Sequence, residues 1–294
     1  MTPDDYCQDK AAKSGSSFYY AFLFLPPERR RAINALYAFC REVDDVVDNA
    51  GDESVARIKL TWWRTQVDKM FDGTPEHPVT RALQPHLQAC DITRERLLAV
   101  IDGMEMDLDQ SRYLDWPGLR KYCWLAAGVV GEMSAGVFGH SEASTLDYAG
   151  KLGLAFQLTN IIRDVGDDAR RGRIYLPVDD LQQFQVKAAD ILNGVYSDRF
   201  TALMRFQTQR ARELYREAAL ALPEADRRAQ RPGLMMAAIY YDLLAEIERD
   251  EWRVLHQRIS LTPLRKLWLA WKTWVGGGRG LLRRLAHGQA KNSA

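Results

Sequence analysis

Apolar residues recur at three- and four-residue spacing through most of the chain, and this periodicity constrains the fold more than any other feature. Such spacing places apolar side chains along one face of an α-helix, whereas a half-buried β-strand needs strict alternation. Runs of β-branched residues in strict alternation are hard to find. The sequence therefore predicts an all-α fold.

Short breaks rich in Gly and Pro separate the periodic segments. The pattern predicts helices at about 28–49, 53–71, 92–109, 117–138, 143–168, 188–193, 197–221, 232–256 and 262–274. The clearest breaks, at 74–78, 172–177, 223–232 and 276–280, are short enough to be loops between packed helices. Because no repeat or linker appears before residue 252, we expect one domain over 1–260 and a basic, Trp-rich tail over 261–294.

The cysteines and the hydropathy pattern narrow the class of protein. The four cysteines (Cys7, Cys40, Cys90 and Cys123) form no C-x-x-C pair, which argues against a zinc module and for reduced thiols. No stretch reaches the roughly 20 apolar residues that a spanning helix requires. The acidic N-terminal residues lack the apolar core of a secretory signal. We therefore expect a cytoplasmic protein.

Charge is distributed unevenly along the chain. From Trp252 to the end there are nine Lys/Arg and no Asp/Glu, which leaves 31 basic against 39 acidic residues elsewhere, a net charge of −8. The tail also carries large apolar side chains, namely Leu264, Leu267, Trp268, Trp271, Trp274, Leu281 and Leu282. Indoles and basic residues favour an anionic bilayer surface, so peripheral contact with the inner membrane is one expectation. A solvated C-terminal helix is the alternative. The basic excess is confined to this tail, and the sequence has no recognised nucleic-acid-binding motif, so nucleic-acid binding is not expected.

Two polar stripes stand out on the predicted helices. Tyr37, Arg41, Asp44 and Asp48 step by four, three and four, and Gln157, Asn160, Asp164 and Asp168 step by three, four and four, so each set shares one helix face. The first stripe lies about 100° from its helix's apolar stripe, whereas a fully solvated face would lie nearer 180° away. Apolar residues surround the second. Both acid pairs are therefore expected to border an interior cavity.

Facing carboxylate pairs form an oxygen-rich site that suits Mg²⁺, whose coordination is usually completed by substrate phosphates. One pair alone is more often a solvated helix face, but two such stripes with neutral and cationic neighbours are hard to explain in that way. The implied substrate is a diphosphate, with Arg41, Arg163, Arg170, Arg171 and Arg173 as candidate clamps on its oxygens.

These residues belong to longer motifs, and with them the sequence resembles the squalene/phytoene synthase family of head-to-head prenyl diphosphate synthases. The motifs are S-F-Y-Y-A-F at 17–22, Y-A-F-C-R-E-V-D-D-V-V-D at 37–48, Y-C-W at 122–124, G-V-V-G at 128–131, Q-L-T-N-I-I-R-D-V-G-D-D at 157–168 and R-G-R-I-Y-L-P at 171–177. The resemblance runs from about residue 6 to about residue 251. It implies a single-domain helical bundle around a central apolar cavity.

The resemblance also implies roles for individual residues. Asp44, Asp48, Asn160, Asp164 and Asp168 would hold Mg²⁺, with Mn²⁺ as a substitute. Substrate would be bound by Ser14, Ser17, Phe18, Phe22, Tyr37, Arg41, Gln157, Asn160, Arg163, Arg173, Tyr175 and Tyr240. Tyr122 matches the family's catalytic tyrosine, and Arg41 with the four aspartates completes the catalytic set. Phe18, Phe22, Ala126, Val130 and Gly131 would line a tunnel for the prenyl tails. The sequence departs from the family at Ser14 and Gly15, where some members carry His and Ser.

The motifs are most similar to bacterial family members that stop at presqualene diphosphate. We expect condensation of two farnesyl diphosphates with release of diphosphate, in squalene or hopanoid biosynthesis. NADPH is not expected. The glycine-rich stretch at 276–280 follows no predicted strand, whereas a dinucleotide-binding glycine motif lies between a strand and a helix. The alternatives are an NADPH-dependent squalene synthase and a phytoene or dehydrosqualene synthase. Chain elongases and terpene cyclases also use acidic boxes, but their second boxes differ. A non-catalytic lipid-binding or assembly relative is the alternative outside enzymes, although the four aspartates are retained.

Overall fold

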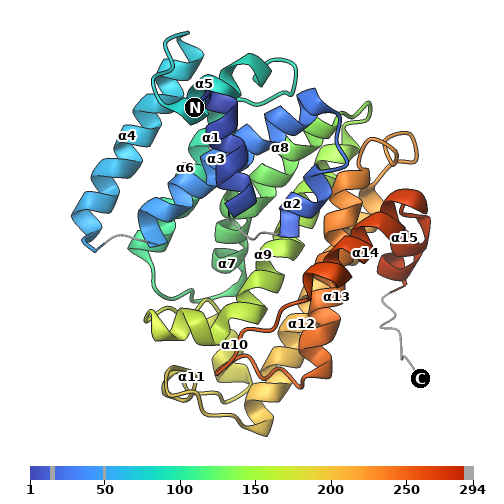
Figure 1. The fold of residues 1–294 in the computed structure, drawn as a ribbon. Helices are drawn as coiled ribbons and strands as arrows, with labels where there is room; N and C mark the ends of the chain where they lie inside the picture. Colours follow the sequence, from blue (N-terminus) through green and yellow to red (C-terminus); the bar gives the residue numbers. More distant parts are fainter. Residues whose placement is uncertain (14–16, 49–50, 288–294) are drawn as a thin grey trace.

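The computed structural model describes residues 1–13, 17–48 and 51–287, which fold into helices joined by loops (Figure 1). They are α1 (Pro3–Lys13), α2 (Ser17–Phe22), α3 (Pro27–Asp48), α4 (Glu53–Phe71), α5 (Pro78–Leu83), η1 (Gln84–His86), α6 (Arg94–Asp109), α7 (Trp116–Cys123), η2 (Trp124–Gly128), α8 (Val129–Phe138), α9 (Ser144–Arg170), α10 (Val178–Gln183), α11 (Ala188–Leu192), α12 (Asp198–Ala221), α13 (Arg231–Arg249), α14 (Pro263–Val275) and α15 (Arg279–Ala286). Within those ranges the only extended pairing is an isolated bridge between Arg112 and Ile174. The all-α prediction is confirmed.

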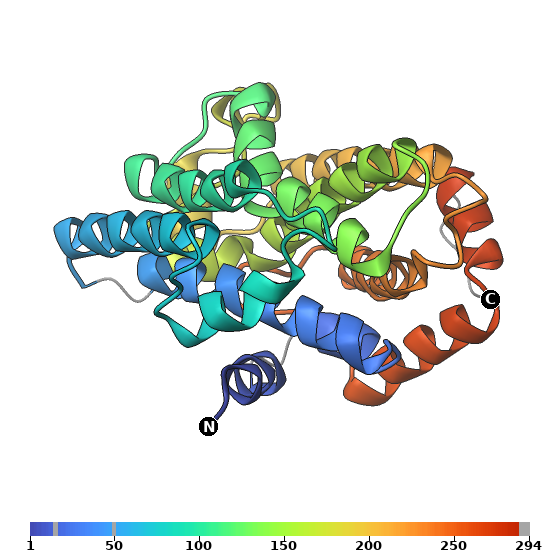
Figure 2. The same ribbon diagram turned by 90° about the horizontal axis from the view of Figure 1, so that it is seen from above.

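The central element is α9, which is buried along most of its length. In Figure 1, α3 and α6 lie on one side of α9 and α12 and α13 lie on the other, and Figure 2 shows the same bundle of helices from above. Two glycines allow α8 and η2 to pack closely against α9. A Cβ at Gly131 would lie 2.2 Å from the backbone oxygen of Ala149, and one at Gly153 would lie 2.3 Å from that of Ala127. Larger residues there would push α8 and η2 away from α9.

Side-chain caps explain where several helices begin. Asp52, Thr93, Asp115, Ser197 and Thr262 each accept a hydrogen bond from a backbone N–H in the first turn of the following helix. Such caps satisfy donors that a helix leaves unpaired at its start. The five helices that follow these caps begin within two residues of their predicted first residues.

Two predicted helices differ from the structure. The helix expected at 117–138 contains a π-helical turn, η2, between α7 and α8. The helix expected at 232–256 ends at Arg249, because Glu251 and Trp252 adopt positive φ values of 55° and 53°. The Trp252 indole is buried and donates to Thr208 Oγ1 at 2.8 Å, which turns the chain toward α9. Among the short helices, only α11 was predicted. The others, α1, α2, α5, α10 and α15, were not.

The C-terminal helices pack on the rest of the bundle. In Figure 1, α14 lies beside α13 and α2, and α15 follows it at the edge of the molecule. Trp274 of α14 packs against Phe24, with ring centroids 5.5 Å apart. None of the helices in the described ranges combines the length and apolar character that a membrane crossing requires.

Candidate active site

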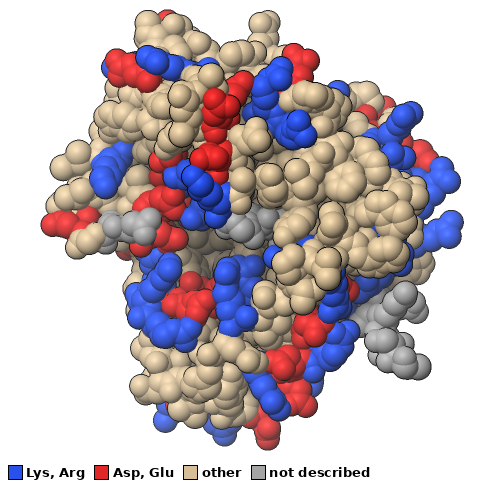
Figure 3. All heavy atoms as spheres, in the orientation of Figure 1, with Lys and Arg blue, Asp and Glu red and all other residues tan. Residues whose placement is uncertain are grey.

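A cavity of about 510 Å³ lies between α3, α8, α9 and α13. At one end it is lined by charged and amide side chains: Arg41, Asp44, Asn160, Arg163, Arg258 and Lys266. We call this end the mouth. In Figure 3 the surface is hollowed near the middle of the face, with acidic and basic side chains gathered around the hollow. The other end, which we call the floor, is closed by Phe138, Tyr148, Gln230 and Gly233.

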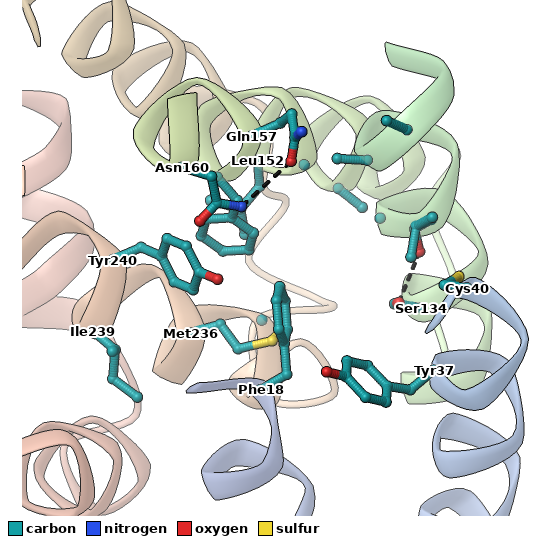
Figure 4. A pocket seen from close by; sticks show the side chains of 18 of the residues that line it. Phe18, Tyr37, Cys40, Ser134, Leu152, Gln157, Asn160, Met236, Ile239 and Tyr240 are labelled. Atoms are coloured by element: carbon teal, nitrogen blue, oxygen red, sulfur yellow. Dashed lines mark hydrogen bonds between the residues drawn. The ribbon is translucent and has the colours of Figure 1, made fainter. Parts of the chain in front are cut away.

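The wall between mouth and floor is largely apolar and aromatic. It includes the five residues expected to line a tunnel, Phe18, Phe22, Ala126, Val130 and Gly131, together with Tyr37, Gln157 and Tyr240. Figure 4 shows the rings of Phe18, Tyr37 and Tyr240 turned toward one another across the cavity. The Phe18 ring centroid lies 6.2 Å from that of Tyr37 and 5.6 Å from that of Tyr240. These aromatic rings separate the charged mouth from the deeper cavity.

The first acidic stripe lies at the C-terminal end of α3. Arg41 pairs with Asp44 and, at 2.7 Å, with Asp45. Burial raises the pKa of Asp44, Arg41 opposes this shift, and the carboxylates of Asp48 and Asp45 add to it, so that the pKa is about 6. Asp48 lies one turn further along, where Arg171 approaches its Oδ1 to 3.5 Å. Removal from water and like charge therefore both disfavour ionised Asp44.

The second acidic stripe lies toward the C-terminal end of α9. Burial alone would raise the pKa of Asp164, but hydrogen bonds and ion pairs from Arg163 (Nε at 2.7 Å) and Arg258 (Nε at 2.9 Å) outweigh it and lower that pKa. Asp168 has the opposite character, because burial together with the charges of Asp164 and Asp107 raises its pKa to about 7. Excess negative charge thus gathers around Asp168.

Asn160, in the same stripe, has an unsatisfied oxygen. Its Nδ2 donates to Gln157 Oε1 at 3.3 Å, the bond drawn in Figure 4. Its Oδ1 is buried and has no hydrogen-bond partner within the described part of the chain. A buried acceptor left unpaired costs about 1–3 kcal/mol. Asn160 Oδ1 is therefore available to a ligand or an ion.

Asp107 on α6 is a fifth carboxylate beside the mouth that sequence reasoning missed; like Asp48, Asp164 and Asp168, it is not among the residues that line the cavity itself. It accepts hydrogen bonds from Tyr175 Oη at 2.6 and 2.8 Å, and Arg173 lies 3.1 Å from it and 3.7 Å from Asp48. Arg173 and Tyr175 thus connect the loop after α9 with α3 and α6. The sequence does contain a signal for this residue. Asp107 lies three residues after Met104 and interrupts the apolar stripe of α6 with a carboxylate.

Tyr122 lies in a stack of three tyrosines beside the cavity. Its ring centroid is 5.5 Å from that of Tyr113 and 5.3 Å from that of Tyr175. Burial raises the pKa of Tyr122 well above its usual value, and neighbouring Tyr175 and Asp107 raise it further. The residue lines the cavity as a neutral phenol immediately before the π-helical turn.

Other predicted residues have different surroundings. Ser14 lies outside the described residues, and only the backbone of Ser17, the first residue of α2, is described. Arg170 pairs with Asp167 and donates to the backbone oxygen of Leu255 at 3.1 Å, and it is not among the residues that line the cavity. Its role as a clamp stays a prediction. Two mouth cations, Arg258 and Lys266, were missed because they belong to the segment after α13.

The acids at the mouth are paired mainly with arginines. Within the described ranges, no group of three His, Cys, Asp or Glu side chains is close enough to hold a metal ion. Arg41, Arg163, Arg173 and Arg258 occupy carboxylate oxygens instead. The mouth thus offers carboxylates, cations and an unpaired amide oxygen, a donor set suited to a phosphate ligand with its counterion.

Known proteins resemble the chain over most of its length. The sequence pattern named squalene/phytoene synthase matches residues 11–265. The phytoene synthase of Arthrospira platensis is 37% identical over 276 residues, which are 90% of this chain and 89% of that protein. The 15-cis-phytoene synthase of Synechocystis sp. is 35% identical over 282 residues, 91% of this chain and 84% of that protein.

Solved structures resemble the fold as well. A dehydrosqualene synthase in complex with a ligand gives a TM-score of 0.83 at 29% identity and covers 93% of this chain and 96% of its own. The squalene synthase HpnC from Alicyclobacillus acidocaldarius gives a TM-score of 0.76 at 28% identity, covering 85% of this chain and 94% of its own.

Proposed function

Because this chain belongs to the squalene/phytoene synthase family, we propose that it joins two prenyl diphosphates head to head and releases one diphosphate. The more specific proposal is that both substrates are farnesyl diphosphate (C15) and that the product is presqualene diphosphate. That is the reaction of the presqualene diphosphate synthase HpnD type, in squalene or hopanoid biosynthesis. The observation that carries the proposal is a charged mouth at the end of a deep apolar cavity.

We propose a magnesium ion at the mouth on the chemistry of its side chains, since no three described His, Cys, Asp or Glu side chains already lie close enough together to hold a metal. The donors are all oxygens, the buried Asn160 Oδ1 has no partner, and burial with like charge raises the pKa of both Asp44 and Asp168. A divalent cation relieves each of these costs. Asp44 and Asp48 of α3, with Asn160, Asp164 and Asp168 of α9, would hold it. When bound, Mg²⁺ would supply positive charge where the leaving diphosphate becomes more negative.

The chain's own cations orient the diphosphates. Arg41 and Arg163 line the cavity beside the acids, and Arg258 and Lys266 approach from the segment after α13. Their guanidinium and ammonium groups stabilise the charge that develops on the departing diphosphate. Phe18, Tyr37 and Tyr240 lie just inside the mouth and shield the resulting allylic cation from water.

Carbon–carbon bond formation then requires the two chains to lie side by side in the apolar cavity. The 2,3-double bond of the acceptor attacks C1 of the donor cation. Loss of one proton closes the cyclopropane ring. The raised pKa of Tyr122 keeps it a neutral phenol, so the released diphosphate is the better proton acceptor and Tyr122 is better suited to orient the reacting chain.

A phytoene synthase is the principal alternative, and the names of the relatives favour it. Those relatives are about a third identical to this chain, which leaves room for a change of substrate length within one reaction type. A dehydrosqualene synthase and an NADPH-dependent squalene synthase are further alternatives. We propose that the reaction proceeds without NADPH and stops at presqualene diphosphate.

We further propose that the outer face of α14 contacts an anionic membrane. Leu264, Trp268, Trp271 and Val275 share this face and are 81%, 55%, 47% and 65% exposed, and Figure 3 shows a mostly uncharged surface over α2 and α14. Trp274, Leu281 and Leu282 pack against the bundle instead, although the sequence suggested the same role for them. Trp268→Ala/Trp271→Ala should reduce sedimentation with phosphatidylglycerol vesicles, whereas Ile58→Ala, at a 69% exposed position of α4, should not.

Product analysis tests the function. The purified protein is incubated with Mg²⁺ and either farnesyl or geranylgeranyl diphosphate, with and without NADPH, and the products are identified by mass. We expect presqualene diphosphate from farnesyl diphosphate in both cofactor conditions. Squalene formed only with NADPH, or phytoene from geranylgeranyl diphosphate as the main product, would contradict the specific proposal. A lipid-binding relative would give no product from either substrate.

A further inference from the structure

The floor of the cavity is formed where three helices begin or end. Phe138 is the last residue of α8, Tyr148 lies near the start of α9, and Gly233 lies in the first turn of α13. Gln230, the residue before α13, donates from Nε2 to two backbone oxygens at the end of α8, at distances of 2.9 and 3.2 Å. The floor is therefore closed by helix ends that are tied to one another.

Tyr148 fills the space that Gly233 leaves open. Its side chain is 2% exposed, and a Cβ on Gly233 would lie only 3.0 Å from Tyr148 Oη. The hydroxyl has no hydrogen-bond partner within the described ranges. Because an unsatisfied buried hydroxyl is destabilising, the oxygen contributes chiefly by its size, extending the ring toward the glycine.

The depth of the cavity lies between the lengths of a C15 and a C20 prenyl chain. Tyr148 and Asn160 are twelve residues apart on α9, which places them about 18 Å apart along the helix axis. With carbon–carbon bonds of about 1.5 Å, an extended C15 chain spans roughly 14 Å and a C20 chain roughly 19 Å. Since the diphosphate occupies the level of Asn160, a C20 chain would collide with Tyr148 whereas a C15 chain would end short of it.

We infer that Tyr148, packed against Gly233, sets the length limit of the prenyl chain, so that the cavity admits C15 and excludes C20. This inference rests on the proposed condensation and identifies the residues that choose its substrate. Neither residue contacts the mouth, so their substitution should change which chain is used without removing the groups that bind diphosphate.

Replacing Tyr148 with alanine tests the length limit directly. kcat/KM is measured with farnesyl and with geranylgeranyl diphosphate for the wild type, Tyr148→Ala and Tyr241→Ala. Tyr241 is a matched control, since it is 1% exposed, its hydroxyl is also unpartnered within the described residues, and it does not line the cavity. We expect the C20/C15 ratio of kcat/KM to rise at least tenfold in Tyr148→Ala and to stay within twofold in Tyr241→Ala.

Substitution of Gly233 tests the same claim in the opposite direction and remains informative if Tyr148→Ala does not fold. Gly233→Val should push side-chain atoms into the floor and raise preference for geranyl diphosphate (C10) over C15 at least tenfold. An active wild type with an unchanged ratio in both variants would overturn the length limit alone, as would a wild type that prefers C20. Turnover of no substrate by the wild type would instead overturn the condensation, and the length limit with it.

Discussion

The mouth and the floor of the cavity differ in how their polar groups are satisfied. At the mouth, burial raises the pKa of Asp44, Asp107 and Asp168, and like-charged neighbours oppose their ionisation. Behind the floor, Asp226 accepts hydrogen bonds from Ser141, Glu142 and Thr145, which join the α12–α13 loop to the start of α9. The mouth therefore keeps unfavourable charge that a ligand can neutralise, whereas Asp226 behind the floor is satisfied by hydrogen bonds that hold neighbouring segments together.

The largest expected effect is at the mouth. Asp168→Asn should lower kcat at least about 10²–10³-fold, because it removes a group that stabilises charge in the transition state. In the presence of a metal chelator, the melting temperature of the Asp168→Asn variant should equal or exceed that of the wild type, because the substitution removes one of the mutually repelling carboxylates. Adding Mg²⁺ with diphosphate should raise the melting temperature of the wild type more than that of the variant.

Asp147, near the other end of α9, is the control for that experiment. Its side chain is 56% exposed and pairs with Lys151 at 2.8 Å, so Asp147→Asn should retain kcat within about threefold. If Asp168→Asn melted well below the wild type in chelator, Asp168 would be a stabilising residue, and the contrast between the two ends would fail.

The floor should show the reverse pattern, a loss of stability. Phe138 is 1% exposed, and Phe138→Ala should lower the free energy of unfolding by about 3–5 kcal/mol, because it leaves a cavity among packed helix ends. Urea unfolding measures the change. A loss below about 1 kcal/mol would mean that the floor collapses easily and is not rigid.

Asp226 offers a pH-dependent test of the same region. Burial alone would raise its pKa, but hydrogen bonds from Thr145, Glu142 and Ser141 hold that pKa well below its usual range. A lowered folded-state pKa adds stability above the unfolded pKa of about 3.9, and this stability is lost as pH falls through the folded value. Asp226→Asn should therefore cost about 1–3 kcal/mol at pH 7. Its difference from the wild type should shrink below about pH 4, and a constant difference from pH 7 to pH 2 would refute this role.

The smallest expected effect concerns Arg258, a mouth cation outside the predicted motifs. Arg258→Gln should reduce kcat/KM about tenfold, because it removes a cation that pairs with Asp164 at 2.9 Å and lines the cavity. Arg253→Gln, in the same segment but exposed and paired with Glu251, should change kcat/KM less than twofold. Equal losses in both variants would point to the segment's conformation and not to the guanidinium at the mouth.

Residues close together in sequence could be predicted better than contacts between distant segments. The long periodic helices, such as 53–71 and 144–170, were predicted within two residues, since their apolar stripes are local. The stop after Arg249 depends on the burial of Trp252 against α12, which no local pattern shows. Likewise, both acidic stripes could be read from helix spacing, but Asp107, Arg258 and Lys266 reach the mouth only through packing. The floor also required the structure, because Tyr148 and Gly233 are 85 residues apart.

A structure with bound ligand tests the central claim most directly. Crystals would be grown with Mg²⁺ and farnesyl S-thiolodiphosphate, an analogue whose leaving group departs slowly. The account predicts diphosphate between α3 and α9, in contact with Arg41 and the oxygen atoms of Asn160 and Asp168, with a prenyl tail ending short of Tyr148. Diphosphate bound away from the mouth, or a tail lying outside the cavity, would contradict it.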